Sequence, residues 1–526
     1  MTLEISATTA HQWLFDGDEI AFLDVREAGQ FGEGHPFLAI PLPFSRLELD
    51  VARLVPRAAT RIVLLDAGDG VAQRAAQCLQ QMGYCQVHVL HGGAPGWQQA
   101  GYTLFQGVNL PSKTFGERVE QVFGTPHISP QKLRQWQRAH KPFVLWDGRP
   151  LAEHRKMTIP GAYCLPNGEL PLRWADTVPD DVTPIVVHCA GRTRSILGAQ
   201  ILRSLQVPNP VYALENGTQG WALAGFALEH GSTRDATPYG QGRDHTAQRH
   251  AAQQWAAEQG VPTLSAAEAQ AWLDDPTRSC FVLDVRSADE FAAHTLPGAQ
   301  HAPGGQLLQA TDQYVGVRGA RLLLLDDEGV RAPVVAAWLR LLGHDAAVLR
   351  EGLRTPVQVP AALRVAPPDL TPPAPLQGEA LRQWVARGAV CVDTRPSWEF
   401  RQQHPAGARW ATRPQLPQVL QSLAAGTPVL CIATDAARAA LALQTAQGTP
   451  RTDMAWTTWA EWQAAQLPVV DGADSLSDAQ AIDYLFFVHD RHDGNLEAAR
   501  QYLAWETGLL AQCSPQELGI FRLPPA

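Results

Sequence analysis

Short apolar runs that end in an Asp-x-Arg triplet recur along the chain, and each is followed by a second apolar run and then by a helical stretch. The first runs lie at residues 22–26, 144–149, 282–286 and 392–395, and the second at residues 62–65, 185–187, 322–325 and 429–432. Residues 71–82 and 195–205 are two of the helical stretches that follow. Short strands alternating with helices predict parallel sheets that are covered by helices.

These repeats divide most of the chain into four copies of one unit, each of about 110 to 140 residues, which is a usual domain size. Breaks rich in Pro, Gly and polar residues place copies one to four at 1–112, 113–240, 248–366 and 372–472. A polar linker is expected over 231–250 and a Pro-rich connector over 366–375. The predicted fold class is therefore α/β, with four tandem three-layer domains and a C-terminal extension over 473–526.

The C-terminal extension is predicted to be helical, with an amphipathic helix over 495–506. We expect it to cover one of the copies with four aromatic side chains, Tyr484, Phe486, Phe487 and Trp505. Nearby lie His489, Asp490, His492 and Asp493. Adjacent ligands with no distant partner make a poor coordination set, so we expect these side chains to cap and pair at helix ends, and we predict no metal.

Composition narrows the classes of function. The 526 residues include 45% hydrophobic and 18% charged residues, which is typical of globular domains. The net charge is −10 and no basic block offsets it, which argues against nucleic-acid binding. The apolar runs are far shorter than the ~20 residues of a membrane span, and the N-terminus lacks an export pattern. Eight cysteines without a CxxC pair or metal-ligand spacing favour a cytoplasmic, reducing location.

Cys189 lies where a β-branched strand gives way to a helix, beyond the carboxyl end of the strand, where α/β sheets bind ligands. Free N–H groups and the positive dipole end at the helix start stabilise an anion there. Together with Arg192 and Arg194, they should lower the pKa of Cys189 and hold a negative group above the sulfur. We interpret Cys189 as a nucleophile that is open to water and faces both guanidinium groups. The alternative is an inert buried cysteine.

The residues around Cys189 resemble the rhodanese (sulfurtransferase) family. Cys189, Arg194 and Ser195 match a cradle that opens with Cys and ends in Arg-Ser. The family's Asp-x-Arg, Glu, Ile-Pro-Gly-Ala and Gly-Gly-x-x-x-Trp landmarks resemble, in that order, residues 147–149, Glu153, residues 159–162 and residues 214–221. The chain departs at Arg192, where glycine is more usual, and has Gly191 one place earlier. The resemblance extends over nearly all of residues 1–472 and is strongest in copy two.

This resemblance implies a thiosulfate sulfurtransferase, and we expect it to need no cofactor. The Cys189 thiolate would attack the outer sulfur of thiosulfate or a related persulfide donor and pass it to cyanide or a thiol acceptor. Loop N–H groups would hydrogen-bond the transferred sulfur, those of Ala190, Gly191, Arg192, Thr193, Arg194 and Ser195. Arg192 or Arg194 would bind the sulfonate end of the donor.

Several neighbours are expected to support the site. Asp147 and Arg149 are interpreted as an ion pair, since such side chains are rarely buried unless paired. Trp221 is expected to pack in the core, and Tyr163 to wall the pocket. His188 alternates to the opposite side of its strand, so we expect it to be buried and hydrogen-bonded rather than to act as a general base.

The other three copies are predicted to be catalytically silent. At the position of Cys189, copies one and three have Asp66 and Asp326, which suit helix caps but repel an anionic substrate. In copy four, Cys431 lies inside its strand, and no arginine follows until Arg438. The silent copies could buttress the active copy, mediate a homodimer or form a cleft for a partner.

Three other functions stay open. A phosphatase or arsenate reductase also uses Cys in a loop, but places Arg six residues later, where this chain has Ser195. A mercaptopyruvate-specific transferase is disfavoured because its Cys-Gly-Ser/Thr-Gly-Val loop is absent. A sulfur-relay scaffold would carry a persulfide on Cys189 without turnover.

Overall fold

The computed structural model describes residues 3–236, 244–361, 364–447, 453–473 and 475–524, and the chain forms two compact units. One unit comprises residues 1–12, 21–108 and 364–487, and therefore most of copies one and four. The other comprises residues 13–20, 109–363 and 488–526, and therefore copies two and three with the end of the chain. Within the described residues, no helix has the length and apolar character needed to cross a membrane.

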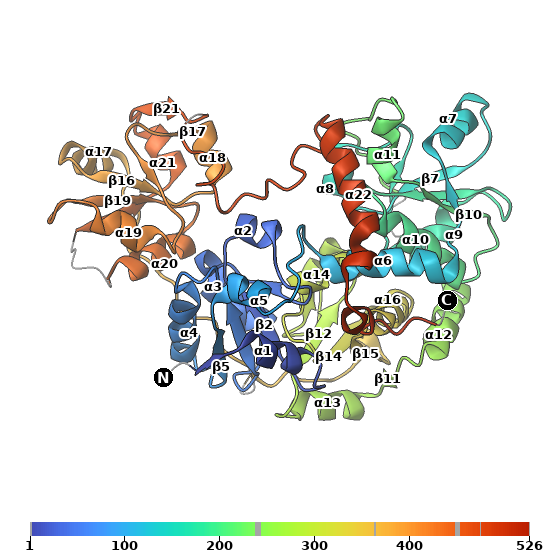
Figure 1. Cartoon of the computed structure of the whole chain (residues 1–526). Helices are drawn as coiled ribbons and strands as arrows, with labels where there is room; N and C mark the ends of the chain where they lie inside the picture. The colour runs from blue at the N-terminus through green and yellow to red at the C-terminus, as the bar shows by residue number, and fades with distance from the viewer. Residues whose placement is uncertain (1–2, 237–243, 362–363, 448–452, 474, 525–526) are drawn as a thin grey trace. The chain divides into compact units, whose positions relative to one another are not determined.

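Copies one and two have the same succession of elements (Figure 1). Copy one consists of β1 (Leu3–Ile5), α1 (Ala7–Leu14), β2 (Ala21–Asp24), α2 (Ala28–Glu33), β3 (Ile40–Pro41), α3 (Leu47–Leu54), β4 (Ile62–Leu65), α4 (Val71–Gln81), β5 (Val87–Leu90) and α5 (Gly93–Gln99). Copy two consists of α6 (Leu110–Phe123), β6 (His127–Ile128), α7 (Pro130–Arg138), β7 (Val144–Asp147), α8 (Leu151–Lys156), β8 (Tyr163–Cys164), α9 (Leu170–Thr177), β9 (Ile185–His188), α10 (Thr193–Ser204), β10 (Val211–Leu214) and α11 (Gly217–Leu223).

Copies three and four repeat this plan. Copy three consists of α12 (Thr246–Glu258), β11 (Thr263–Leu264), α13 (Ala266–Asp274), β12 (Cys280–Asp284), α14 (Ala288–Ala293), β13 (Gln300–His301), α15 (Gly304–Gln309), β14 (Arg321–Leu325), α16 (Arg331–Leu341) and β15 (Asp345–Leu349). Copy four consists of α17 (Gly378–Ala386), β16 (Val390–Asp393), α18 (Ser397–Gln402), β17 (Gln403–Pro405), β18 (Arg409–Trp410), α19 (Leu416–Gln421), β19 (Val429–Ile432), α20 (Ala436–Gln447), β20 (Met454–Thr457), α21 (Trp459–Ala464) and β21 (Val469–Asp471). Helices α22 (Leu496–Gln512) and α23 (Pro515–Leu518) follow.

Each copy is built on a parallel sheet, and its central strands are buried on both faces, as the apolar runs predicted. The strand orders are β1-β5-β4-β2-β3, β6-β10-β9-β7-β8 and β11-β15-β14-β12-β13 in copies one to three. Copy four has β18-β16-β19-β20, which is the same order without the first edge strand. The predicted α/β class is therefore confirmed.

The connecting segments differ in part from expectation. Residues 246–250 of the expected linker belong to α12, and residues 237–243 lie outside the described residues. The expected connector at 366–375 has neither helix nor strand. In the C-terminal extension, which was expected to be helical, residues 475–495 form turns and bends and contain no helix. Tyr484 and Phe486 pack on a cluster of copy four that contains Phe400.

Copies two and three share a core around Trp338 on α16. Its side chain is fully buried, and its ring centroid lies 5.2 Å from that of Trp255 on α12 and 6.0 Å from that of Phe115 on α6. Arg331, also on α16, donates to Glu169 of copy two, with Nη1 3.1 Å from Oε1. Helix α6, the first helix of copy two, thus contributes to the packing of copy three.

Replacing Trp338 by Ala is expected to lower the free energy of unfolding by about 3 to 5 kcal/mol, because it removes a fully buried indole from this shared core. Urea unfolding of the full chain, followed by circular dichroism, measures the change. Tyr163→Ala is the control, since Tyr163 belongs to the same unit and is 48% exposed. Equal loss of stability in the two variants would contradict the assignment of Trp338 to a shared core.

Candidate active site

Cys189 directly follows β9, and its loop runs into α10, as the sequence predicted. The start of α11 braces this loop from behind. The Thr218 N–H donates to the carbonyl oxygen of Cys189 at 2.8 Å, and the Gln219 N–H to that of Ala190 at 3.0 Å. Ser195, in the first turn of α10, donates its Oγ–H to Cys189 Sγ at 3.1 Å. The thiol is therefore held at the amino end of a helix with a hydroxyl donor on its sulfur.

Gly217 is required for this bracing. Its φ is +53°, and a Cβ added there would lie 2.3 Å from the Cys189 carbonyl oxygen. A side chain would thus be strained by its backbone conformation and would also collide with the loop. The turn that begins α11 can approach the nucleophile loop only with glycine at this position.

Copies one and three show what the same loop binds when the cysteine is absent. In copy three, the Asp326 carboxylate accepts the N–H groups of four successive residues at the end of the loop and the start of α16, at 2.7–3.2 Å: Gly329, Val330, Arg331 and Ala332. In copy one, the Asp66 carboxylate accepts those of Gly68, Gly70 and Ala72 at 2.8–3.1 Å. The loop between the strand and the helix is therefore an anion receptor, and in these copies the chain's own carboxylate fills it.

Copy four differs, because Cys431 lies within β19 and not in the loop. Burial raises the pKa of Cys431 to about 12, so the group is a neutral thiol at physiological pH. Its side chain has no solvent exposure. That copy four is silent stays a prediction, which the burial of this thiol favours.

The sequence analysis expected Arg192 and Arg194 to face the sulfur and hold an anionic group above it. In the structure, both guanidinium groups bind carboxylates instead. Arg192 forms two hydrogen bonds with Glu117 on α6, at 2.7 and 2.9 Å, and also pairs with Glu120. Arg194 forms two with Glu153 on α8, at 2.7 and 2.8 Å. Both guanidinium groups are thus neutralised by carboxylates from neighbouring helices.

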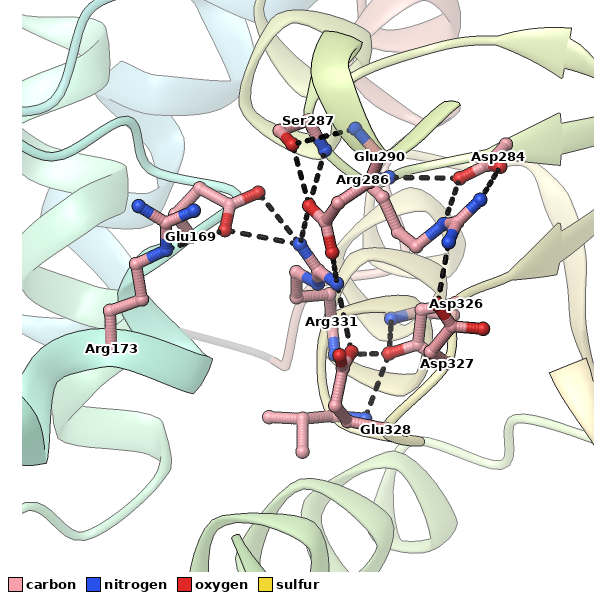
Figure 2. Close-up of polar contacts among 12 residues, drawn as sticks. Glu169, Arg173, Asp284, Arg286, Ser287, Glu290, Asp326, Asp327, Glu328 and Arg331 are labelled. Atoms are coloured by element: carbon pink, nitrogen blue, oxygen red, sulfur yellow. Dashed lines mark hydrogen bonds and ion pairs between the residues drawn. The ribbon is translucent and has the colours of Figure 1, made fainter. Parts of the chain in front are cut away.

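The Arg194–Glu153 pair has a counterpart in copy three, which lacks the cysteine. Arg331 stands at the position of Arg194, and Glu290 on α14 at that of Glu153, with Nη2 2.7 Å from Oε1 (Figure 2). Glu328 and Glu169 also accept from Arg331. Because the pair occurs without a nucleophile, it is explained by loop structure rather than by donor binding.

Asp147 and Arg149 form the buried pair that the Asp-x-Arg pattern predicted. Arg149 donates Nε–H and Nη2–H to the Asp147 carboxylate at 2.8 and 2.7 Å, and a further Nη2–H to the Met157 carbonyl at 2.6 Å. Burial opposes ionisation of Asp147, but the charge of Arg149 and the hydrogen bonds that it donates outweigh burial and lower the pKa of Asp147. This network fixes the end of β7 beside the nucleophile strand.

His188, Trp221 and Tyr163 lie away from the sulfur. His188 is fully buried, its Nε2 lies 3.3 Å from Thr158 Oγ1, and burial lowers its pKa to about 4, so it is neutral at physiological pH. Trp221 is 1% exposed and donates its Nε1–H to the Ala227 carbonyl, in the core. Tyr163 lines a pocket of about 570 Å³ whose lining contains none of the Cys189 loop residues.

The C-terminal extension covers the cradle. Helix α22 packs on α6 and α11 (Figure 1), and Glu506 accepts the Thr193 Oγ1–H at 2.7 Å. A Cβ added at Gly191 would lie 2.9 Å from both Glu506 Oε2 and Tyr502 Cε1. Cys189 is consequently only 2% exposed. The expectation that its thiol is open to water was wrong, because nothing local to the loop indicates which copy the terminal helix covers.

Sequence reasoning also missed the residues that surround the cradle from outside the loop. Lys113 and Glu117 come from α6, whereas Arg491, Tyr502 and Glu506 come from the C-terminal extension. Glu117 lies 75 residues before Arg192 of the loop, and Glu506 lies 313 residues after Thr193. The amphipathic pattern of α22 was the available signal, and it gave a helix without its partner.

The described residues contain one cluster with metal-ligating geometry, Glu290, Asp327 and Glu328. The chain's own cations already hold these carboxylates: Arg331 binds Glu290 and Glu328, and Arg286 binds Asp327 at 2.6 Å (Figure 2). Of the acidic and histidine residues near 490, His489 pairs with Asp490 at 2.9 Å and Asp493 with Lys156 at 3.2 Å. These pairs are of the kind that the sequence analysis expected.

Comparison with known proteins identifies the family to which this architecture belongs. A family model described as a rhodanese-like domain matches residues 6–100, 129–224 and 265–355, which is more than half of the chain. The chain belongs to the rhodanese family. The family model does not match copy four, whose sheet has the strand order of the other copies without the first edge strand.

Solved structures extend this rhodanese assignment. A thiosulfate sulfurtransferase from Pseudomonas aeruginosa is 36% identical, with 99% of each chain covered and a TM-score of 0.89. The Alr3790 protein from Anabaena sp. is 24% identical, with 19% of this chain and 91% of that one covered and a TM-score of 0.19. A rhodanese-related protein from Thermoplasma volcanium is 23% identical, with 20% of this chain and 97% of that one covered and a TM-score of 0.17. Each of these two matches spans about one copy. None of the curated proteins matches the chain. This rhodanese is an enzyme of the sulfurtransferase type.

Gly217→Ala is expected to lower the rate of sulfur transfer at least about tenfold, because the new Cβ must displace the Cys189 carbonyl group. The left-handed backbone conformation of the new alanine costs a further ~1–2 kcal/mol. Gly225→Ala is the matched control: its φ is also positive, at +79°, but nothing lies within 4 Å of the added Cβ. The control should lose some stability and keep its rate. Equal rates in both variants would show that the contact does not position the nucleophile.

Proposed function

We propose that this chain moves sulfane sulfur from thiosulfate, or from a related persulfide donor, to cyanide or a thiol acceptor through a persulfide on Cys189. The observation that carries the proposal is the cradle of loop N–H groups, which holds a carboxylate in copies one and three and has a thiol at that position in copy two. The similar solved structure bears the name of a thiosulfate sulfurtransferase.

The reaction proceeds in two steps. The Cys189 thiolate attacks the outer sulfur of thiosulfate, an S–S bond forms, and sulfite leaves with the electron pair of the bond that breaks. The acceptor then attacks the outer sulfur of the persulfide, and the Cys189 thiolate is the leaving group. Cyanide gives thiocyanate, and a thiolate gives a new persulfide.

The loop residues Ala190 to Ser195 serve both steps with their backbone N–H groups. They stabilise the negative charge of the outer sulfur, just as their counterparts in copy three hold the Asp326 carboxylate. Ser195 Oγ–H, 3.1 Å from Sγ, stabilises the cysteine thiolate as attacking and leaving group. Asp147 and Arg149 position the strand ends, and Trp221 packs behind them.

The setting follows from the same chemistry. A thiol that cycles between thiolate and persulfide requires a reducing compartment, so the proposal includes a cytoplasmic location. The donor and acceptor are small molecules, nucleic acid and membrane are not partners, and the silent copies buttress the active copy or mediate a homodimer. Because Cys189 is 2% exposed, substrates reach it when side chains of the cover move aside.

The burial of Cys189 favours one second candidate, a relay protein that carries the persulfide and hands it to a partner without turnover. The phosphatase and arsenate reductase alternatives have less support. Arg194 stands one residue earlier than their loop arginine, and its guanidinium is bound to Glu153.

Cys189→Ser is expected to abolish thiocyanate formation from thiosulfate and cyanide, because the sulfur-carrying atom is lost. In the unaltered chain, mass spectrometry after exposure to thiosulfate should find one added sulfur atom on the Cys189 peptide. Cys431→Ser is the matched control, a buried cysteine outside a loop, and should keep its activity. Turnover that survives in Cys189→Ser would refute the proposal, and sulfur loading without turnover would favour the relay.

A further inference from the structure

Two cations from outside the Cys189 loop contact Tyr502 of α22, the helix that covers the cradle. Lys113 on α6 has a side chain that is 7% exposed; its Nζ donates to Tyr502 Oη and lies 3.8 Å from Glu506 Oε1. The same ammonium is 4.8 Å from the centre of the Tyr502 ring and 5.4 Å from that of Trp505. The Arg491 guanidinium stacks on Tyr502 as well, 4.5 Å from the ring centre.

Both cations have hydrogen-bonding capacity to spare. An ammonium has three N–H donors and a guanidinium five. Lys113 gives one to Tyr502, and Glu506 Oε1 lies beyond hydrogen-bond distance. Arg491 Nη1 donates to the Val488 carbonyl at 3.3 Å, whereas its buried Nε has no partner among the described residues. In the part of the chain that the structure describes, no carboxylate pairs with Arg491.

These groups lie next to the nucleophile. Tyr502, which both cations contact, lies against the loop, since a Cβ added at Gly191 would be 2.9 Å from Tyr502 Cε1. Glu506, 3.8 Å from the Lys113 ammonium, accepts the hydroxyl of Thr193, where the loop enters α10. Burial lowers the pKa of Lys113, which nearby negative charges counteract. An anion arriving at this position would therefore stabilise the charged form of the lysine.

The loop arginines cannot serve in the same way. Arg192 and Arg194 each bind a carboxylate with two hydrogen bonds, and the copy-three equivalent of the second pair exists without a nucleophile. Among the described residues, Lys113 and Arg491 have one carboxylate within 4 Å between them, that of Glu506 beside Lys113. The excess of positive charge thus lies on the cover side of the cradle.

We propose that Lys113 and Arg491 bind the oxyanion end of the sulfur donor while its outer sulfur enters the cradle of Cys189. The inference deepens the proposed function, on which it rests, and it names the donor class: a sulfane sulfur bonded to a sulfonate or a similar oxyanion. As the bond to the outer sulfur breaks, the leaving sulfite keeps the electron pair, and the two cations stabilise its charge.

The test measures binding apart from reaction. Thiosulfate is titrated calorimetrically into the full chain that carries Cys189→Ser, which cannot form a persulfide. Adding Lys113→Gln or Arg491→Gln is expected to raise the Kd at least about tenfold, the usual effect of losing one charge-assisted hydrogen bond. Lys113→Arg should retain most of the affinity. Arg491 lies in a partly exposed segment. The Arg491→Gln variant therefore keeps the test valid if Lys113→Gln, which alters a buried residue, does not fold.

The matched control is Arg500→Gln, the same change of charge on the exposed face of α22, where the side chain is 58% exposed and pairs with Glu497. Its Kd should not change. The inference would be overturned if Lys113→Gln and Arg491→Gln left the Kd unchanged, if only Arg192→Gln raised it, or if thiosulfate did not bind at all. Binding that needs both cations, without any persulfide on Cys189 in the unaltered chain, would instead keep this site and reject the proposed function.

Discussion

Backbone N–H groups at the start of a helix, converging on an anion at the end of a parallel strand, are the interaction around which copies one to three are built. The loop that presents them must hold several donors in one direction, and it would leave them unpaired without an anion. In copies one and three, Asp66 and Asp326 supply that anion permanently. In copy two, Cys189 stands at this position, and its sulfur accepts a hydrogen bond from Ser195 in the first turn of the helix.

The surrounding charges follow from the same constraint. A loop arginine within reach of the anion also needs a carboxylate, since burying an unpaired guanidinium is costly. Arg194 finds Glu153 and Arg331 finds Glu290, each on the short helix that follows the Asp-x-Arg strand. The Asp-x-Arg pair fixes the end of that strand and so sets where the short helix begins. The resulting frame is alike in copy two, which has the loop cysteine, and in copy three, which lacks it.

The cover changes the site more than any residue of the loop. By packing α22 on α6 and α11, it excludes water from the cradle and leaves Cys189 2% exposed. Exclusion of water strengthens the electrostatic interactions of every group beneath the cover, including Lys113 and Glu506. The extension therefore brings charged side chains to the cradle of copy two and also shields that cradle from water. This cover distinguishes copy two from the other three copies.

Local patterns in the sequence determined the repeated α/β units, the position of Cys189 between β9 and α10, the buried Asp147–Arg149 pair and the core role of Trp221. Each of these depends on residues close together in the chain or on a periodicity that one element carries. The partners of Arg192, the burial of Cys189, and the approach of Lys113 and Arg491 to the cradle were decided only by the tertiary structure. An amphipathic helix requires an apolar surface to pack on, but its sequence does not identify that surface. In the structure, α22 packs on α6 and α11, beside the Cys189 loop.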